Sequence, residues 1–185
     1  MDGSPVEEPG GALQYGATEG YEPLRTQLSA FMKTKGVEVD PSGLIVTTGC
    51  LGGHVLQSLM KGDEAAAFEK AGRLQEIFGR DNLFVELQDH GIPEQHKTNP
   101  QLVEIARKLQ APLLATNDSH YTNPDDAESH DALLCVQTNA LITQTGDERF
   151  KFKGEGHYLK SAYEMRNLFR ELEVACDNSL WIAER

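Results

Sequence analysis

Asp118 and His120 are the residues whose types and spacing most directly suggest chemistry, because they follow an apolar run at 112–116 and lie two positions apart. If that run is a strand that continues, their side chains point to one face, with Cα atoms roughly 6–7 Å apart. Carboxylate and imidazole are common ligands of divalent metals, so both could reach one ion or two neighbouring ions. In the alternative interpretation, Asp118 caps the next turn and His120 is a solvated loop residue.

Cys50 is a third candidate ligand, since it ends another apolar run at 44–48. A thiolate would favour zinc or another soft ion, although a lone cysteine is also often a small buried hydrophobic residue. His90 follows Asp89 in a further loop and could line the same site. The spacing singles out none of the other histidines, which are His54, His96, His130 and His157.

A basic and aromatic stretch could contact nucleic acid, and it comprises Lys151, Phe152, Lys153, Tyr158 and Lys160. The alternative is a solvated edge. The chain carries 29 acidic and 17 basic residues, a formal charge of −12. This balance disfavours a broad positive surface and tight autonomous binding to nucleic acid.

The elements that position these residues alternate between strand and helix. The expected strands are 44–48, 83–87 and 112–116, and the expected helices between them are 54–60, a longer alanine-rich helix closed by Gly79, and 100–110. Such alternation favours right-handed crossovers and a parallel sheet. Because ligands gather beyond the carboxyl ends of parallel strands, the candidate residues would meet there.

The flanking segments are expected to be a tail and further helices. Residues 1–11 are acidic and rich in Pro and Gly, a composition that does not favour folding. Helices are expected from about Tyr21 to Gly36, and at 125–136, 161–169 and 176–183, with Ser161 as an N-cap.

The length of 185 residues and a hydrophobic content of 39% fit an ordinary globular chain. Three widely spaced cysteines form no disulfide framework and suit a reducing compartment. The apolar runs are too short for a membrane span, and the N-terminus lacks the features of a signal peptide. We therefore expect a cytoplasmic protein without a membrane partner.

Three motifs give a family resemblance: GLIVTTGC at 43–50, FVELQDHG at 84–91 and LATNDSHY at 114–121. Their order and spacing resemble the PHP domain of the bacterial DNA polymerase III alpha subunit, and the resemblance extends over 43–185. It implies an α/β fold, namely the second half of a partial (βα) barrel of PHP type, preceded by a helix-containing N-terminal segment.

The resemblance also implies a cluster of divalent metals, with zinc or manganese as the expected ion. Cys50 matches the late cysteine ligand of the family, and Asp118 and His120 match its final Asp-x-His pair. In some members such a cluster supports a 3′ to 5′ exonuclease. No histidine precedes His54, so the earlier ligands of the family are missing and the isolated chain is expected to be weakly active or inactive.

Residues 11–42 resemble a different family, the fold-type I pyridoxal-phosphate-dependent aminotransferases. The similarity starts at GALQYGATEGY, residues 11–21, in which Tyr15 would match a phosphate-contacting tyrosine. It predicts a chimera of an N-terminal segment, 1–42, and a PHP part, 43–185. Because no Schiff-base lysine can be placed, bound pyridoxal phosphate is not expected.

Three functions follow as hypotheses. The first is a fragment of a bacterial replicative DNA polymerase, a nucleotidyltransferase that acts on DNA together with other replicase subunits. The second is a non-catalytic scaffold or interaction module, and the third is an aminotransferase fragment. A half barrel would expose a strand edge and apolar helix faces, which predicts self-association.

Overall fold

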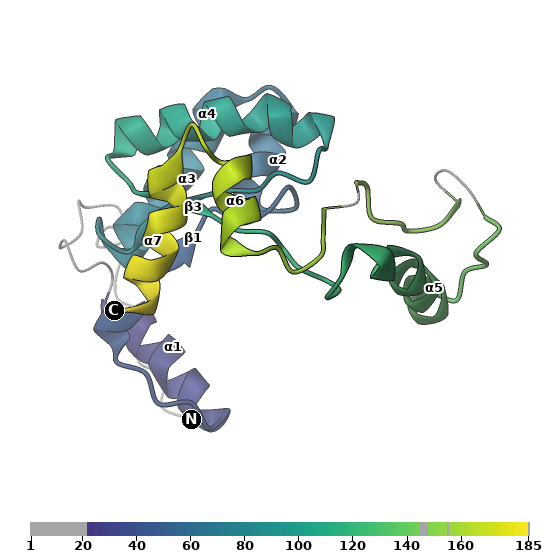
Figure 1. Ribbon diagram of the computed structural model, residues 1–185. Helices are drawn as coiled ribbons and strands as arrows, with labels where there is room; N and C mark the ends of the chain where they lie inside the picture. Colours follow the sequence, from purple (N-terminus) through teal and green to yellow (C-terminus); the bar gives the residue numbers. More distant parts are fainter. Residues whose placement is uncertain (1–21, 145–147, 155, 185) are drawn as a thin grey trace.

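The computed structural model describes residues 22–144, 148–154 and 156–184, and it shows helices arranged around a small sheet (Figure 1). The tail predicted at 1–11 and Tyr15 lie outside the described residues.

The sheet contains three parallel strands, in the order β1 (Val46–Thr47), β2 (Leu83–Leu87) and β3 (Leu113–Ala115). Val46 pairs with Leu83, and Leu87 pairs with Ala115. The three predicted strands and their parallel arrangement are thus confirmed, although β1 is shorter than the apolar run that predicted it. This mixed helix and strand architecture is compatible with a partial α/β fold of PHP type.

Three helices connect the strands. Along the chain, helices α2 (His54–Met60) and α3 (Glu64–Phe78) follow β1 and precede β2, and α4 (Pro93–Leu109) follows β2 and precedes β3. The Asp63 carboxylate caps α3 by accepting a hydrogen bond of 2.9 Å from the Ala66 N–H. The buried core joins one face of β2 to these helices and to the chain end, and it includes Leu59, Ala67, Ala71, Leu83, Val85, Leu87, Leu102, Phe169 and Ala175.

Helix α4 begins seven residues before the predicted start at Pro100, so that prediction was wrong. Pro93 occupies the first turn, where a missing N–H costs no helical hydrogen bond, and Pro100 lies inside the helix. The turns before Pro100 carry the buried side chains of Gln95 and Thr98. Their packing accounts for the continuation of the helix through an unfavourable residue.

The remaining elements flank this unit. They are α1 (Glu22–Thr34), η1 (Pro41–Gly43), η2 (Pro124–Asp126), α5 (Ala127–Thr138), α6 (Ala162–Leu168) and α7 (Glu173–Ala183). Helix α7 packs on β3, where the Asn178 amide donates to the Leu113 carbonyl oxygen at 2.7 Å. Helices α1 and α5 extend away from the sheet (Figure 1). Among the described residues, no helix combines the length and apolar character that crossing a membrane requires.

Candidate metal centre

Asp118 and His120 lie close together in the loop after β3, with 3.3 Å between Asp118 Oδ1 and His120 Nε2. The predicted proximity is therefore present, but its cause differs from the predicted one. Strand β3 ends at Ala115, and Asp118 adopts a left-handed backbone with φ of 47°. Aspartate tolerates this conformation, so a turn, rather than the pleat of a strand, brings the two side chains together.

His157 joins this pair from a distant segment. One potential ligand atom from each of Asp118, His120 and His157 lies within 4.8 Å of those from the other two. The segments are joined through their backbones, because the His120 N–H donates to the His157 carbonyl oxygen at 2.8 Å and the Leu159 N–H donates to that of Tyr121 at 3.0 Å. Spacing in the sequence missed His157; its one local signal is that it directly precedes Tyr158, where a PHP-like stretch resumes.

Within the part of the chain that the structure describes, one ring nitrogen of His157 forms a hydrogen bond and the other does not. Nε2 lies 3.1 Å from the Lys153 carbonyl oxygen, which can only accept, so in the neutral ring Nε2 carries the proton and Nδ1 the lone pair. Nδ1 is buried and has no hydrogen-bond partner among the described residues. A buried acceptor without a donor is uncommon in proteins. With the neighbouring carboxylate and imidazole, this donor set fits a divalent cation.

His90 is buried against His157, and the two rings stack with centroids 3.9 Å apart. Both nitrogens of His90 are engaged: the Gln95 amide lies 2.9 Å from Nδ1, and Nε2 lies 2.6 Å from the Asn117 carbonyl oxygen. Burial lowers the pKa of His90, and the positive charge of Lys160 lowers it further. His90 thus lies beside His157 as a neutral ring that supports it.

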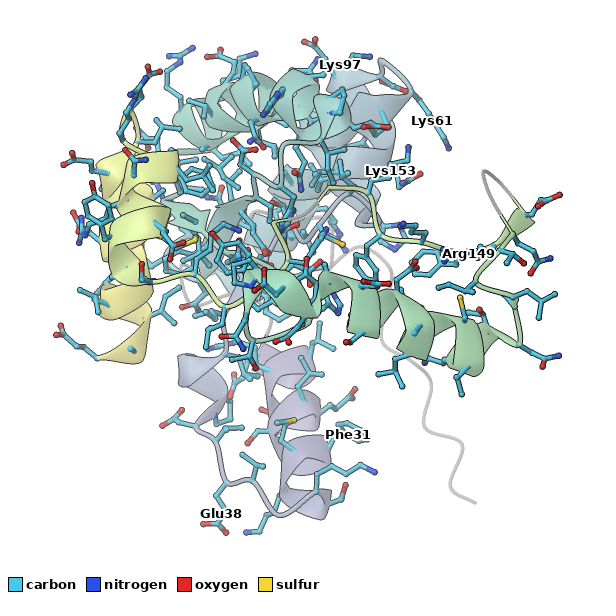
Figure 2. The ribbon with its side chains drawn as sticks, turned by 45° about the vertical axis from the view of Figure 1, so that its right-hand side comes forward. Phe31, Glu38, Lys61, Lys97, Arg149 and Lys153 are labelled. Atoms are coloured by element: carbon cyan, nitrogen blue, oxygen red, sulfur yellow. The ribbon has the colours of Figure 1, made fainter. Side chains whose placement is uncertain are left out.

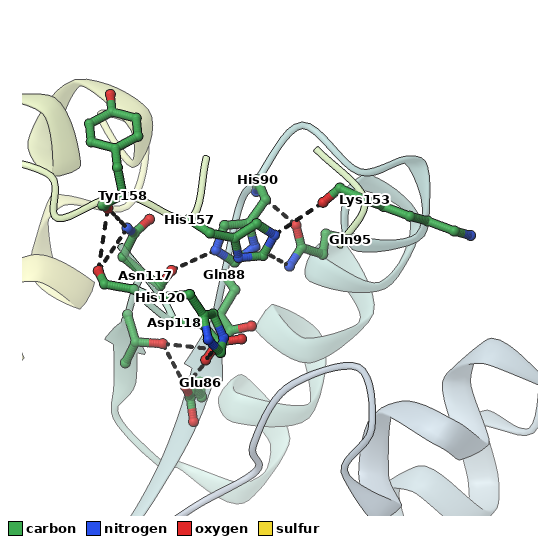
Figure 3. A network of polar contacts seen from close by, with 12 residues as sticks. Glu86, Gln88, His90, Gln95, Asn117, Asp118, His120, Lys153, His157 and Tyr158 are labelled. Atoms are coloured by element: carbon green, nitrogen blue, oxygen red, sulfur yellow. Dashed lines mark hydrogen bonds and ion pairs between the residues drawn. The ribbon is translucent and has the colours of Figure 1, made fainter. Parts of the chain in front are cut away.

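The Glu86 carboxylate connects the carboxyl ends of the three strands. It accepts a hydrogen bond from the Gln88 amide at 3.1 Å (Figure 3). It also accepts hydrogen bonds from the hydroxyls of Thr47, at 2.6 Å, and Thr116, at 2.5 Å. These residues lie on or next to β1, β2 and β3. The network therefore fixes the edge of the sheet from which the loop carrying Asp118 departs.

Cys50 is exposed in the turn after β1, and its thiol does not belong to the group formed by Asp118, His120 and His157. The structure thus brings together two of the three predicted ligands and adds a histidine. The three lysines of the basic stretch all pair within the chain. Burial lowers the pKa of Lys160, whose ammonium contacts Asn117 Oδ1, the Gly156 carbonyl oxygen and the Tyr158 ring.

Comparison with known proteins agrees with this architecture. Residues 16–90 match the model of the PHP domain family. The chain is 50% identical over 144 residues to the DNA polymerase III subunit alpha of Mycobacterium leprae, an alignment that covers 77% of this chain and 12% of the relative. The resemblance to the PHP domain of polymerase III alpha subunits is confirmed. The chain thus spans about an eighth of the length of these relatives.

The match to the family model begins at residue 16, before the predicted boundary at 42/43, and the boundary itself stays a prediction. The polymerase III alpha subunit of Deinococcus radiodurans is 39% identical over 180 residues, which covers 90% of this chain and 13% of the relative. An alignment that omits only a tenth of the chain must include part of 1–42. The aminotransferase resemblance of 11–42 gains no support from these comparisons.

Proposed function

We propose that the chain is the second half of a PHP-type (βα) barrel from a bacterial replicative DNA polymerase and that it holds a partial divalent-metal site. The observation that carries this proposal is the Asp118–His120 pair, 3.3 Å apart at the carboxyl end of the sheet, in a chain 50% identical over most of its length to a polymerase III alpha subunit. By analogy with these relatives, the proposed partners are DNA and other replicase subunits. The proposed location is the cytoplasm.

Asp118 and His120 would hold zinc or manganese, and Cys50 would contribute where the family pattern places a thiolate. When bound, such an ion lowers the pKa of coordinated water and stabilises charge on phosphate oxygens, the chemistry of 3′ to 5′ exonucleolytic cleavage. The side chains of Asp118 and His120 are 40% and 34% exposed, which leaves the site accessible to a DNA end. Glu86 and His90 act behind them as positioning residues.

A non-catalytic scaffold is the second candidate, and it is favoured because the exposed Cys50 does not belong to the group of Asp118, His120 and His157. A site with few ligands binds a metal weakly, and the chain would then serve mainly to support the polymerase.

Elemental analysis of protein purified without chelator tests the proposal. We expect near-stoichiometric zinc or manganese in the wild type and its loss in the Asp118→Ala, His120→Ala double variant, with a parallel loss of cleavage of single-stranded DNA. His54→Ala is the matched control, because this exposed histidine lies on α2, outside the group. Metal without cleavage would favour the scaffold, and no metal in the wild type would contradict the site.

A further inference from the structure

We propose that His157 is a metal ligand through Nδ1 and that it joins Asp118 and His120 to give a site with three donors from these residues. This inference rests on the proposed function and specifies the composition of the same site. It assigns to His157 a role that its position in the sequence does not suggest.

The first argument is the protonation pattern of the ring. Metal-bound histidines usually donate their second ring N–H to a carboxylate or a backbone carbonyl, which fixes the tautomer and the ring orientation. His157 has this arrangement without a metal, because Nε2–H donates to the Lys153 carbonyl oxygen. The other nitrogen, Nδ1, is left with a lone pair, buried and without a hydrogen-bond partner among the described residues.

The second argument is immobilisation. His90 stacks on the His157 ring at 3.9 Å, and the edge-to-face contact of Phe152 has a centroid distance of 4.8 Å. His157 is only 4% exposed. A ligand held in one orientation loses little conformational entropy when it binds an ion, so the site is organised before the metal arrives.

The third argument is the chemistry of the donor set. Two imidazoles and one carboxylate suit zinc and other first-row divalent ions, whereas a thiolate would shift the preference toward softer ions. The partial exposure of Asp118 and His120 leaves coordination positions open on the solvent side. The expected ligand is therefore a first-row divalent cation that retains water.

Titration of the full chain with cobalt(II), followed by its visible absorption, tests the inference. His157→Gln should weaken cobalt binding at least tenfold and change the absorption envelope, because one nitrogen ligand is lost. His54→Gln is the matched control and should leave both unchanged. Wild-type affinity and an unchanged spectrum in folded His157→Gln would overturn the inference.

A second measurement covers the case in which His157→Gln fails to fold. In wild-type protein labelled with 15N-histidine, bound 113Cd should show scalar coupling to two histidines, one of them through Nδ1 with Nε2 still protonated. Coupling to His120 alone would overturn the inference.

The outcomes separate the two proposals. Metal that is lost in the Asp118→Ala, His120→Ala variant but bound normally by His157→Gln would refute the role of His157 and leave the proposed site intact. Absence of any cobalt or cadmium binding by the wild type would refute both.

Discussion

At the scale of single residues, the polar groups around the site are almost fully hydrogen-bonded. Glu86 accepts from three neighbours, and both ring nitrogens of His90 have partners. Unsatisfied buried polar groups are costly, so such completeness is the normal state of a folded protein. His157 Nδ1 is an exception, because it is buried without a hydrogen-bond partner among the described residues. This exception is the reason to assign the nitrogen a ligand role.

Glu164 should titrate far below an ordinary glutamate. Hydrogen bonds from Ser161 and from the Tyr158 hydroxyl lower the pKa of its carboxyl from 4.5 to about 2. Because the folded-state pKa lies below the unfolded one, the carboxylate stabilises the fold above about pH 4.5, and this contribution is lost as the pH falls toward 2. A 13C carboxyl titration should place the midpoint near 2.

The variant Glu164→Gln separates charge from shape, since glutamine also serves at the third helical position of a capping box. Its urea midpoint should lie below that of the wild type at pH 6, and the two should converge as the pH falls below 4.5, the ordinary value. A constant difference across this range would contradict the assigned cause.

At the scale of elements, the segment that carries His157 is docked by close backbone contact. Gly154 has φ of +80°, and a Cβ atom at this position would collide with the His90 carbonyl oxygen. A Cβ atom at Gly156 would meet His90 Cα at 3.1 Å. Two glycines thus allow the chain to approach the buried His90 closely, and this approach permits His157 to stack on the His90 ring.

Gly154→Ala should destabilise the protein more than Gly62→Ala. Both glycines have nearly the same left-handed backbone, with φ of +80° and +78°, but nothing lies within 4 Å of a Cβ atom at Gly62. Each variant should lose about 1–2 kcal/mol from the backbone conformation, and only Gly154→Ala should add a steric cost. Urea unfolding measures the loss in free energy of unfolding for both variants. Equal losses would show that the backbone at His90 can move away from the added methyl group without a measurable cost.

At the scale of the whole molecule, the structure exposes large apolar side chains far from the sheet. On and after α5, Leu133, Val136, Leu141 and Ile142 are 63, 80, 68 and 52% exposed, and Figure 2 shows side chains projecting from this helix into solvent. Apolar surface of this kind is often covered by a partner. This agrees with the self-association predicted for a half barrel, which stays a prediction.

Light scattering during size-exclusion chromatography should therefore give a mass above the monomer value of 20.4 kDa that rises with concentration. Val136→Asp should lower this mass, because it introduces a charge into the apolar surface. Ala65→Asp, at an exposed position on α3, adds the same charge elsewhere and should have no effect. Strictly monomeric elution at high concentration would refute the prediction.

Features that depend on local interactions could be predicted from the amino-acid sequence. The run at 83–87 became β2 with the same bounds, Ser161 caps α6, and Gly79 ends α3, because side-chain alternation and helix capping act over a few residues. The Asp-x-His pair was recognisable because its two residues lie only two positions apart in the sequence. The metal role of this pair, like that of Cys50, stays a prediction.

Contacts between residues that are distant in the sequence could not be predicted in this way. Pro93 and Pro100 both resemble helix starts locally, and packing of the intervening turns on the sheet selected Pro93. His157 lies 37 positions from His120 in the sequence, and no periodicity links the two. Backbone pairing of the segments around them and the stack on His90 bring them together. Such long-range contacts arise from the packing of the whole chain, so the third donor of the candidate site emerged only in three dimensions.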